Sequence, residues 1–332
     1  MRALELKDCL KELIEQKIPT FIWGSPGIGK SSIVKQIAYE KNLEFIDLRL
    51  SLLDPTDLKG IPFFNSSTKE AIWAPPNFLP KDNKSSGILF LDEINSAPPS
   101  VQAAAYQLVL DRKVAEYSLP ENWAIVAAGN LESDMALTYH MPTALSNRFV
   151  HLELEAHIDD WLIWAYSANI DYTICSYLRF DSSKLFSFNP EDDSKAFATP
   201  RSWEYVDKIL KSKIEDSSLV KILAGTIGEE VAVSFVNFKK VMQNLPNIED
   251  ILDGKDVSFS NDSKVLFALI TAVAMRLKNA TNTQIENVIK FSHKLPKEYA
   301  IALIKDIQQN GIDIEMLPAW QEWVEEFAYL LE

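Results

Sequence analysis

The residue types and spacing at positions 24–32 indicate a site for phosphate. The segment reads Gly24, Ser25, Pro26, Gly27, Ile28, Gly29, Lys30, Ser31 and Ser32, and it satisfies the pattern G-x-x-x-x-G-K-[ST]. Its glycines allow backbone N–H groups to approach an anion closely, and the N-terminus of the following helix adds positive charge. Lys30 is expected to contact the β- and γ-phosphates of a nucleotide, and Ser31 to ligate Mg²⁺. The alternative is a glycine-rich turn with a chance lysine.

Two adjacent carboxylates, Asp92 and Glu93, follow the apolar run 88–91. An apolar run of this length is typical of a buried parallel strand, which would deliver both side chains at its tip. Asp92 is expected to hold Mg²⁺, and Glu93 to polarise an attacking water as a general base. A carboxylate pair after an apolar run is common by itself. Its place roughly sixty residues after the phosphate-binding loop (24–31) leaves room for an intervening strand.

One amide and two arginines complete the candidate site. Asn130 follows the apolar run 124–128 and could orient water against a γ-phosphate, or it could be a turn residue after Gly129. An arginine near a transferring phosphoryl group stabilises its developing charge. Arg148 precedes an expected strand, and Arg201 lies in the first turn of an expected helix. Either could instead pair with acids in this acidic chain. The other candidate arginines are Arg49, Arg112, Arg179 and Arg276.

The elements that must position these residues alternate between strands and helices in the first half of the chain. We expect helices at 2–17, 31–40 and 100–110, and strands at 20–23, 45–50, 88–91, 123–128 and 149–154. Residues 54–87 are expected to form loops with a short helix or hairpin. This alternation predicts a parallel α/β sheet with helices on both faces.

After residue 155 the pattern becomes helical. The expected helices are 157–178, 200–214, 218–245, 262–278, 283–294, 296–309 and 317–331, and the acidic loops 181–198 and 246–261 are expected boundaries. We therefore predict an α/β nucleotide-binding domain over 1–155, a helical lid over 156–245 and a helical C-terminal extension over 246–332.

Composition narrows the partners and the location. The 332 residues carry a net charge of −14, which disfavours binding to nucleic acid or to anionic lipid. Two cysteines imply no disulfide framework, and the four histidines have no ligand-like spacing that predicts a metal site besides Mg²⁺. The N-terminus lacks the apolar stretch of a signal peptide, and no apolar run is long enough to span a membrane. The expected location is cytoplasmic.

Taken together, the motifs resemble those of AAA+ ATPases, which have a P-loop NTPase core, and most closely the MoxR-like branch. The resemblance covers about residues 15–245 and includes DEIN at 92–95, AAGN at 127–130, ALSNRF at 144–149, TPRSW at 199–203, DPTDLKGIP at 54–62 and APPNFLP at 74–80. It implies that ATP is bound with Mg²⁺ and hydrolysed. Asn130 would be the sensor-1 residue, Arg148 the arginine finger that acts on a neighbouring subunit's ATP, and Arg201 the sensor-2 residue. Arg112 remains a rival for the finger, and the acidic insertion at 181–198 departs from the family pattern.

The same resemblance implies a ring, usually a hexamer, that remodels or activates a protein partner in a chaperone-like way. For MoxR-like proteins this partner typically carries a von Willebrand factor A domain. Phe63, Phe64, Trp73 and Phe78 could grip the partner, although packing onto the sheet is the favoured interpretation. Three rivals remain: a DNA-directed AAA+ protein such as a helicase or clamp loader, a small-molecule kinase with the same loop, and a scaffold that binds nucleotide without hydrolysis.

Overall fold

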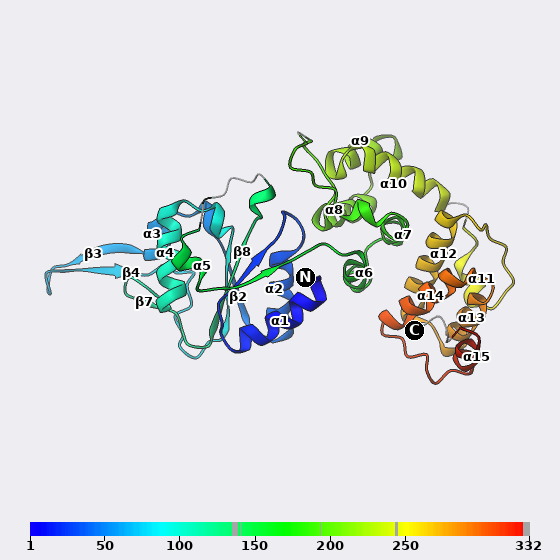
Figure 1. Ribbon diagram of the computed structural model, residues 1–332, viewed down its shortest axis with the longest axis horizontal. Coiled ribbons are helices and arrows are strands. Elements are labelled where there is room, and N and C mark those ends of the chain that lie inside the picture. Colours follow the sequence, from blue (N-terminus) through cyan, green and yellow to red (C-terminus); the bar gives the residue numbers. More distant parts are fainter. Residues whose placement is uncertain (135–138, 140, 193, 243–244, 328–332) are drawn as a thin grey trace. The chain divides into compact units, whose positions relative to one another are not determined.

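The computed structural model describes residues 1–134, 139, 141–192, 194–242 and 245–327 (Figure 1). It divides into two compact units. Met1–Ala156 and Asn189–Asp192 form the α/β unit, and His157–Phe188 and Asp193–Glu332 form the helical unit. The boundary between 156 and 157 lies one residue from the expected one. A further boundary at 245/246, between a lid and an extension, stays a prediction.

A five-stranded parallel sheet forms the centre of the α/β unit. Its strands are β1 (Thr20–Trp23), β2 (Glu44–Arg49), β5 (Gly87–Asp92), β8 (Trp123–Gly129) and β9 (Val150–Glu153), in the order β2-β5-β8-β1-β9. The apolar runs of β5 and β8 are buried almost throughout, as expected for parallel strands covered on both faces. The predicted fold class is confirmed.

Successive residues of the central strands face opposite sides of the sheet. Leu89 and Leu91 share a core with the buried face of α4 (Pro99–Asp111), whereas the equally buried Ile88 and Phe90 point to the other face. There α2 (Lys30–Glu40) packs on β5 and β8, and α1 (Ala3–Glu15) packs on α2. Figure 1 shows α1 and α2 on one side of the sheet and α3 and α4 on the other.

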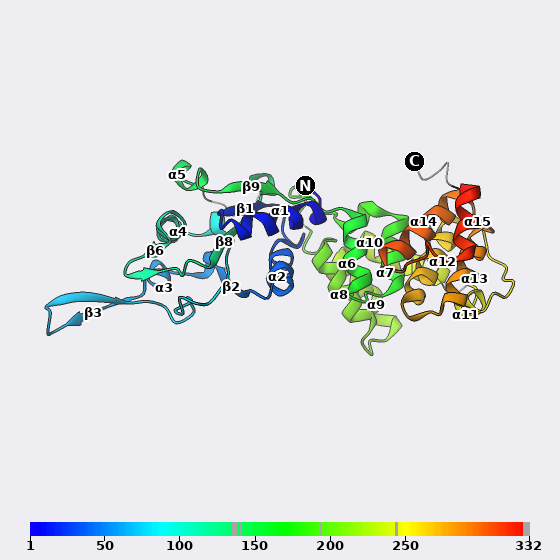
Figure 2. The ribbon, with the colours of Figure 1, turned by 90° about the horizontal axis from the view of Figure 1, so that it is seen from below.

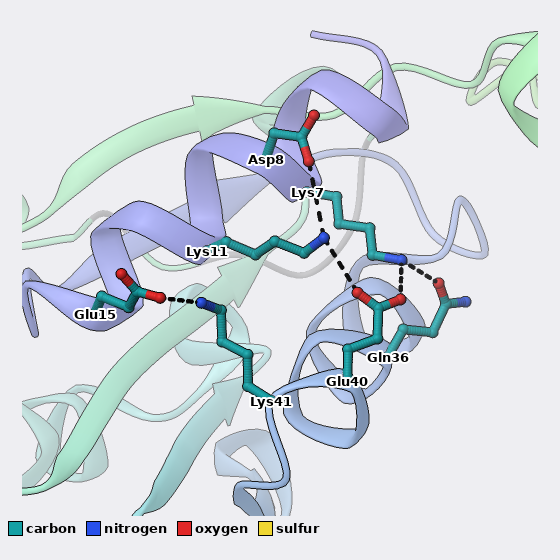
Figure 3. A network of polar contacts seen from close by, with 7 residues as sticks. All are labelled: Lys7, Asp8, Lys11, Glu15, Gln36, Glu40 and Lys41. Carbon is teal, nitrogen blue, oxygen red and sulfur yellow. Dashed lines mark hydrogen bonds and ion pairs between the residues drawn. The ribbon is translucent and has the colours of Figure 1, made fainter.

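Ion pairs join α1 to the C-terminal end of α2 (Figure 3). The Oε1 of Glu40 accepts a hydrogen bond from the Nζ of Lys7 at 2.6 Å, and its Oε2 is 3.1 Å from the Nζ of Lys11. Lys41 pairs with Glu15 at the other end of α1. Because α2 begins at Lys30, these contacts fix the helix that carries the predicted phosphate-binding lysine.

The segment between β2 and β5 folds into α3 (Pro55–Lys59) and a hairpin of β3 (Ile61–Asn65) and β4 (Glu70–Ala74). The hairpin projects from the sheet in both ribbon views (Figures 1 and 2). Phe63 and Phe64 are 58% and 73% exposed, so the expectation that they pack onto the sheet is wrong. Phe78 packs against the sheet core, as expected. A second small hairpin, β6 (Lys113–Val114) and β7 (Tyr117–Ser118), has no counterpart among the expected elements.

The helical unit differs from expectation where helices end. The helix expected at 157–178 is two helices, because Asn169 has a φ of 54° between them. The helix expected at 218–245 is also two, separated by Gly228 with a φ of 87°. A short helix lies within the loop expected at 246–261, and the end of the last expected helix, 328–331, lies outside the described residues. The helices are α6 (Ile158–Ser167), α7 (Tyr172–Phe180), α8 (Pro200–Leu210), α9 (Asp216–Ile227), α10 (Glu229–Met242), α11 (Ile248–Leu252), α12 (Ser263–Arg276), α13 (Asn282–Ser292), α14 (Lys297–Gln309) and α15 (Pro318–Phe327).

Two apolar clusters fill the helical unit. Aromatic rings of α7, α8 and α10 pack together around Tyr177, Trp203 and Phe235. A second cluster joins α11 to α15 and includes the fully buried Trp323. The helix α12 packs along α7, so the two groups of helices are in contact. In the part of the chain that the structure describes, no helix combines the length and apolar character needed to cross a bilayer.

Candidate functional site

The phosphate-binding loop occupies the turn from the end of β1 to the start of α2. Gly29 has a φ of 105°, a backbone conformation that side chains other than glycine rarely adopt. At Gly24, a Cβ atom would lie 2.4 Å from the Cδ1 of Ile28 and 3.0 Å from the carbonyl oxygen of Leu154. Backbone angle and space therefore require glycine at these positions. The N–H groups in the first turn of an α-helix point away from the helix, and this is where anions commonly bind.

Lys30 reaches across this loop to the end of the neighbouring strand. Its Nζ donates to the Oδ1 of Asn130 at 3.1 Å, to the carbonyl oxygen of Ser25 at 3.2 Å, and to that of Gly24. The sheet explains this meeting, because Trp23 at the end of β1 pairs with Gly129 at the end of β8. The structure thus brings together two predicted site residues that are a hundred positions apart in the sequence.

Asp92 ends β5 beside the same loop. Burial raises its pKa, as do the negative charges of Asp47 and Glu93, while the positive charge of Lys30 opposes this rise. Its Oδ1 accepts a hydrogen bond from the backbone N–H of Glu93 at 3.0 Å. Hard divalent cations prefer carboxylate oxygens as ligands, and the neighbouring negative charges favour a cation here. Asp92 and its surroundings therefore fit Mg²⁺.

Glu93 is held by residues at the end of β2 and just after it. Its backbone is left-handed, with a φ of 55°. Ser51, in the short 3₁₀ helix Leu50–Leu52, donates a hydrogen bond to its Oε2, and the Nε of Arg49 lies 3.7 Å from its Oε1. Sequence reasoning missed Ser51 and treated Arg49 only as a candidate arginine. Their position at the carboxyl end of the strand next to β5 is the signal that could have found them.

Asn95 is a second residue that sequence reasoning left without a role. Its side chain is buried, donates from Nδ2 to the carbonyl oxygen of Asn130 at 2.9 Å, and accepts at Oδ1 from the N–H of Asn130 at 3.3 Å. The backbone N–H and C=O of Asn130, the predicted sensor-1 residue, are therefore both hydrogen-bonded to the side-chain amide of Asn95.

Arg148 follows the short helix α5 (Thr143–Ser146) and is exposed, without a side-chain hydrogen bond or ion pair among the described residues. The residues on either side of Arg148, Ser146 and His151, are linked to Trp23 at the end of β1. The indole N–H of Trp23 donates to the Nδ1 of His151 at 2.8 Å, which leaves the imidazole N–H on Nε2, 2.8 Å from the carbonyl oxygen of Ser146.

The rival Arg112 has a structural role. Its Nη2 donates to the carbonyl oxygens of Pro120 at 2.8 Å and Trp123 at 2.6 Å, which braces the turn before β8. Arg179 and Arg276, two further candidates, pair with carboxylates of the helical unit.

Arg201 is exposed in the first turn of α8, whose N-terminus is capped by Thr199 and Ser202. It belongs to the helical unit, and its role toward the nucleotide stays a prediction.

The fold and this site define a P-loop nucleotide-binding unit. Residues 20–151 match the family model described as the ATPase family associated with various cellular activities (AAA). The matched segment spans the phosphate-binding loop, Asp92, Glu93, Asn130 and Arg148. It lies entirely within the α/β unit.

Two solved structures illustrate the wider likeness of the chain. A variant of RuvB from Thermotoga maritima has 14% identity, covering 98% of this chain and 86% of that one, with a TM-score of 0.40. NtrX from Brucella abortus in complex with ADP has 14% identity, covering 93% of this chain and 68% of that one, with a TM-score of 0.42. At these scores, neither likeness bears on function.

Proposed function

We propose that the protein binds ATP together with Mg²⁺ and hydrolyses the terminal phosphoanhydride bond. The observation that carries the proposal is the meeting of Lys30 and Asn130 at the carboxyl ends of β1 and β8. Asp92 ends the strand β5, which is adjacent to β8, and Glu93 follows it directly. The family match over residues 20–151 supports it.

Each residue has a defined task in this reaction. The loop N–H groups and Lys30 bind the phosphates, and Glu93 accepts a proton from the attacking water. Ser31 and Asp92 would hold Mg²⁺, which when bound neutralises phosphate charge. Asn130 orients the water through its side-chain amide.

Two variants test the hydrolysis directly. Glu93→Gln keeps the shape of the side chain but cannot accept the proton, so ATP binding should persist while turnover is lost. Lys30→Ala should lose nucleotide binding. Glu116→Gln, an exposed change of the same type, is the control and should behave as the wild type. Normal turnover in Glu93→Gln would remove Glu93 from the mechanism.

We further propose a ring, with six subunits as the expected number, in which Arg148 acts on the ATP of the neighbouring subunit and Arg201 on that of its own. This is supported by the exposure of Arg148 and by the backbone contacts that occupy Arg112. Arg148→Ala should be inactive alone but recover activity when mixed with Lys30→Ala subunits. Absence of recovery at every mixing ratio would contradict an arginine supplied in trans.

The ring is proposed to remodel or activate a protein partner, as MoxR-like proteins do on partners with a von Willebrand factor A domain. The projecting hairpin supports a protein partner, because Phe63 and Phe64 are adjacent in β3, face opposite sides and are both exposed. The net charge of −14 disfavours the DNA-directed alternative. A salt-dependent shift of duplex DNA by the protein would revive that alternative.

A further inference from the structure

We infer that Asn95 is a positioning residue that sets the placement of Asn130, and through it the rate of ATP hydrolysis. This inference rests on the proposed function. Asn95 lies in the short 3₁₀ helix Ile94–Ser96, just beyond Asp92 and Glu93, and is only 2% exposed. Its backbone is held separately, because its carbonyl oxygen accepts from the N–H of Tyr139 at 2.7 Å.

The Asn95 amide replaces a missing strand neighbour. The pairing of β5 with β8 ends at Leu91 and Ala127, and the chain leaves the sheet at Glu93 with its left-handed backbone. Among the described residues, the hydrogen bonds of the Asn130 N–H and C=O, just past the end of β8, are those to the Asn95 side chain. Because the side-chain amide of Asn95 both donates and accepts, it can pair with the two groups at once.

The Asn95 side chain lies directly against the backbone of Gly129. A Cβ atom there would lie 2.4 Å from the Oδ1 of Asn95 and 2.7 Å from the Cζ of Phe21. The amide therefore fits against a backbone without a side chain. With its main chain held in this way, Asn130 directs its Oδ1 to the Nζ of Lys30 at 3.1 Å.

Aspartate at position 95 removes half of this pairing. A carboxylate still accepts from the N–H of Asn130 but cannot donate to its carbonyl oxygen. Asn95→Asp should therefore lower kcat by about ten-fold or more, while the Kd for ATP changes by less than about three-fold. Asn122→Asp, the same change in the exposed loop before β8, is the matched control and should leave both values unchanged.

A double-mutant cycle separates positioning from a general structural effect. If Asn95 acts through Asn130, then Asn95→Asp should lower kcat in the wild type but not in an Asn130→Ala background. Equal losses in both backgrounds would overturn the inference. An inactive wild type, or an Asn130→Ala variant with normal turnover, would instead contradict the proposed function.

Gly129→Ala provides a second route if Asn95→Asp does not fold. Its methyl group displaces the Asn95 amide without adding charge, so the same loss of kcat is expected, again only when Asn130 is present. ATP binding by each variant reports that the α/β unit is folded. A kcat of Gly129→Ala equal to the wild type would overturn the inference.

Discussion

Removing the carboxylate of Asp306 should strongly destabilise the helical unit. Arg179 on α7 and Asp306 on α14 form a bidentate ion pair, in which both terminal guanidinium nitrogens, Nη1 and Nη2, donate to the carboxylate. The side chains are only 15% and 0% exposed. Asp306→Ala leaves the arginine charge buried without its partner, which costs about 3–5 kcal/mol. Replacing both residues, by Arg179→Met and Asp306→Leu, should cost much less because no charge remains buried.

Urea denaturation followed by tryptophan fluorescence would measure this effect. The chain has eight tryptophans, and five belong to the helical unit, namely Trp161, Trp164, Trp203, Trp320 and Trp323. Asp256→Ala is the control, because Asp256 is 90% exposed and pairs with Lys294 in the same unit. Its loss should have little effect on stability, because exposed ion pairs are screened by solvent.

Two results would refute the reasoning. The first is an Asp306→Ala variant that loses no more stability than Asp256→Ala. The second is a double variant that is as unstable as Asp306→Ala. That result would mean that the destabilisation comes from lost packing and not from a buried arginine charge without a partner. Because α7 belongs to the expected lid and α14 to the expected extension, one shared unfolding transition is expected for both segments.

Three further changes have defined outcomes. Asp92→Asn should abolish turnover and raise the free energy of unfolding at pH 8, by about 1.4 kcal/mol for each unit by which the pKa of Asp92 is elevated. In denaturation experiments this gain in stability should shrink as the pH falls toward 3.8, the ordinary pKa of an aspartate. Gly228→Ala should lower the free energy of unfolding by about 1–3 kcal/mol, because alanine is strained at φ 87° and ψ 153°. A smaller loss of stability in denaturation experiments would contradict that strain. Glu40→Gln should lower the free energy of unfolding by about 0.5–1 kcal/mol at pH 7, and by less in 1 M salt. The hydrogen bond from Lys7 lowers the pKa of Glu40, so the stabilisation should disappear as the pH falls below 4.5. A loss of stability that does not depend on salt would count against the ion pairs.

The parallel sheet was predictable because its central strands β5 and β8 are buried on both faces. Such strands appear in the sequence as continuous apolar runs, as at Ile88–Leu91 and Trp123–Ala128. The breaks at Asn169 and Gly228 were not predictable from periodicity. In both cases the apolar pattern continues past a single residue of positive φ, so two helices look like one. The β3–β4 hairpin was only an open option, because its apolar residues are exposed on both faces and do not alternate.

Some residues of the candidate site could be predicted from local sequence patterns, and others could not. Lys30, Asp92, Glu93 and Asn130 belong to local patterns that follow apolar strands, so the sequence alone could predict them as candidates. The roles of Ser51 and Asn95 depend on which strands are neighbours. The order β2-β5-β8-β1-β9 puts the end of β2 beside Glu93 and the end of β5 beside Asn130. Motif spacing carries no information about this order.

The charges around the site connect stability to the proposed reaction. The negative charges of Asp47 and Glu93 disfavour the ionised form of Asp92, and the positive charge of Lys30 favours it. The folded protein therefore keeps Asp92 ionised at a cost, and a bound divalent cation would remove that cost. ATP with Mg²⁺ should consequently raise the melting temperature of the wild type more than ATP with EDTA does. In Asp92→Asn, where the repulsion is already gone, the difference between the two additions should be small. An equal difference in both proteins would show that the metal stabilises the fold without involving Asp92.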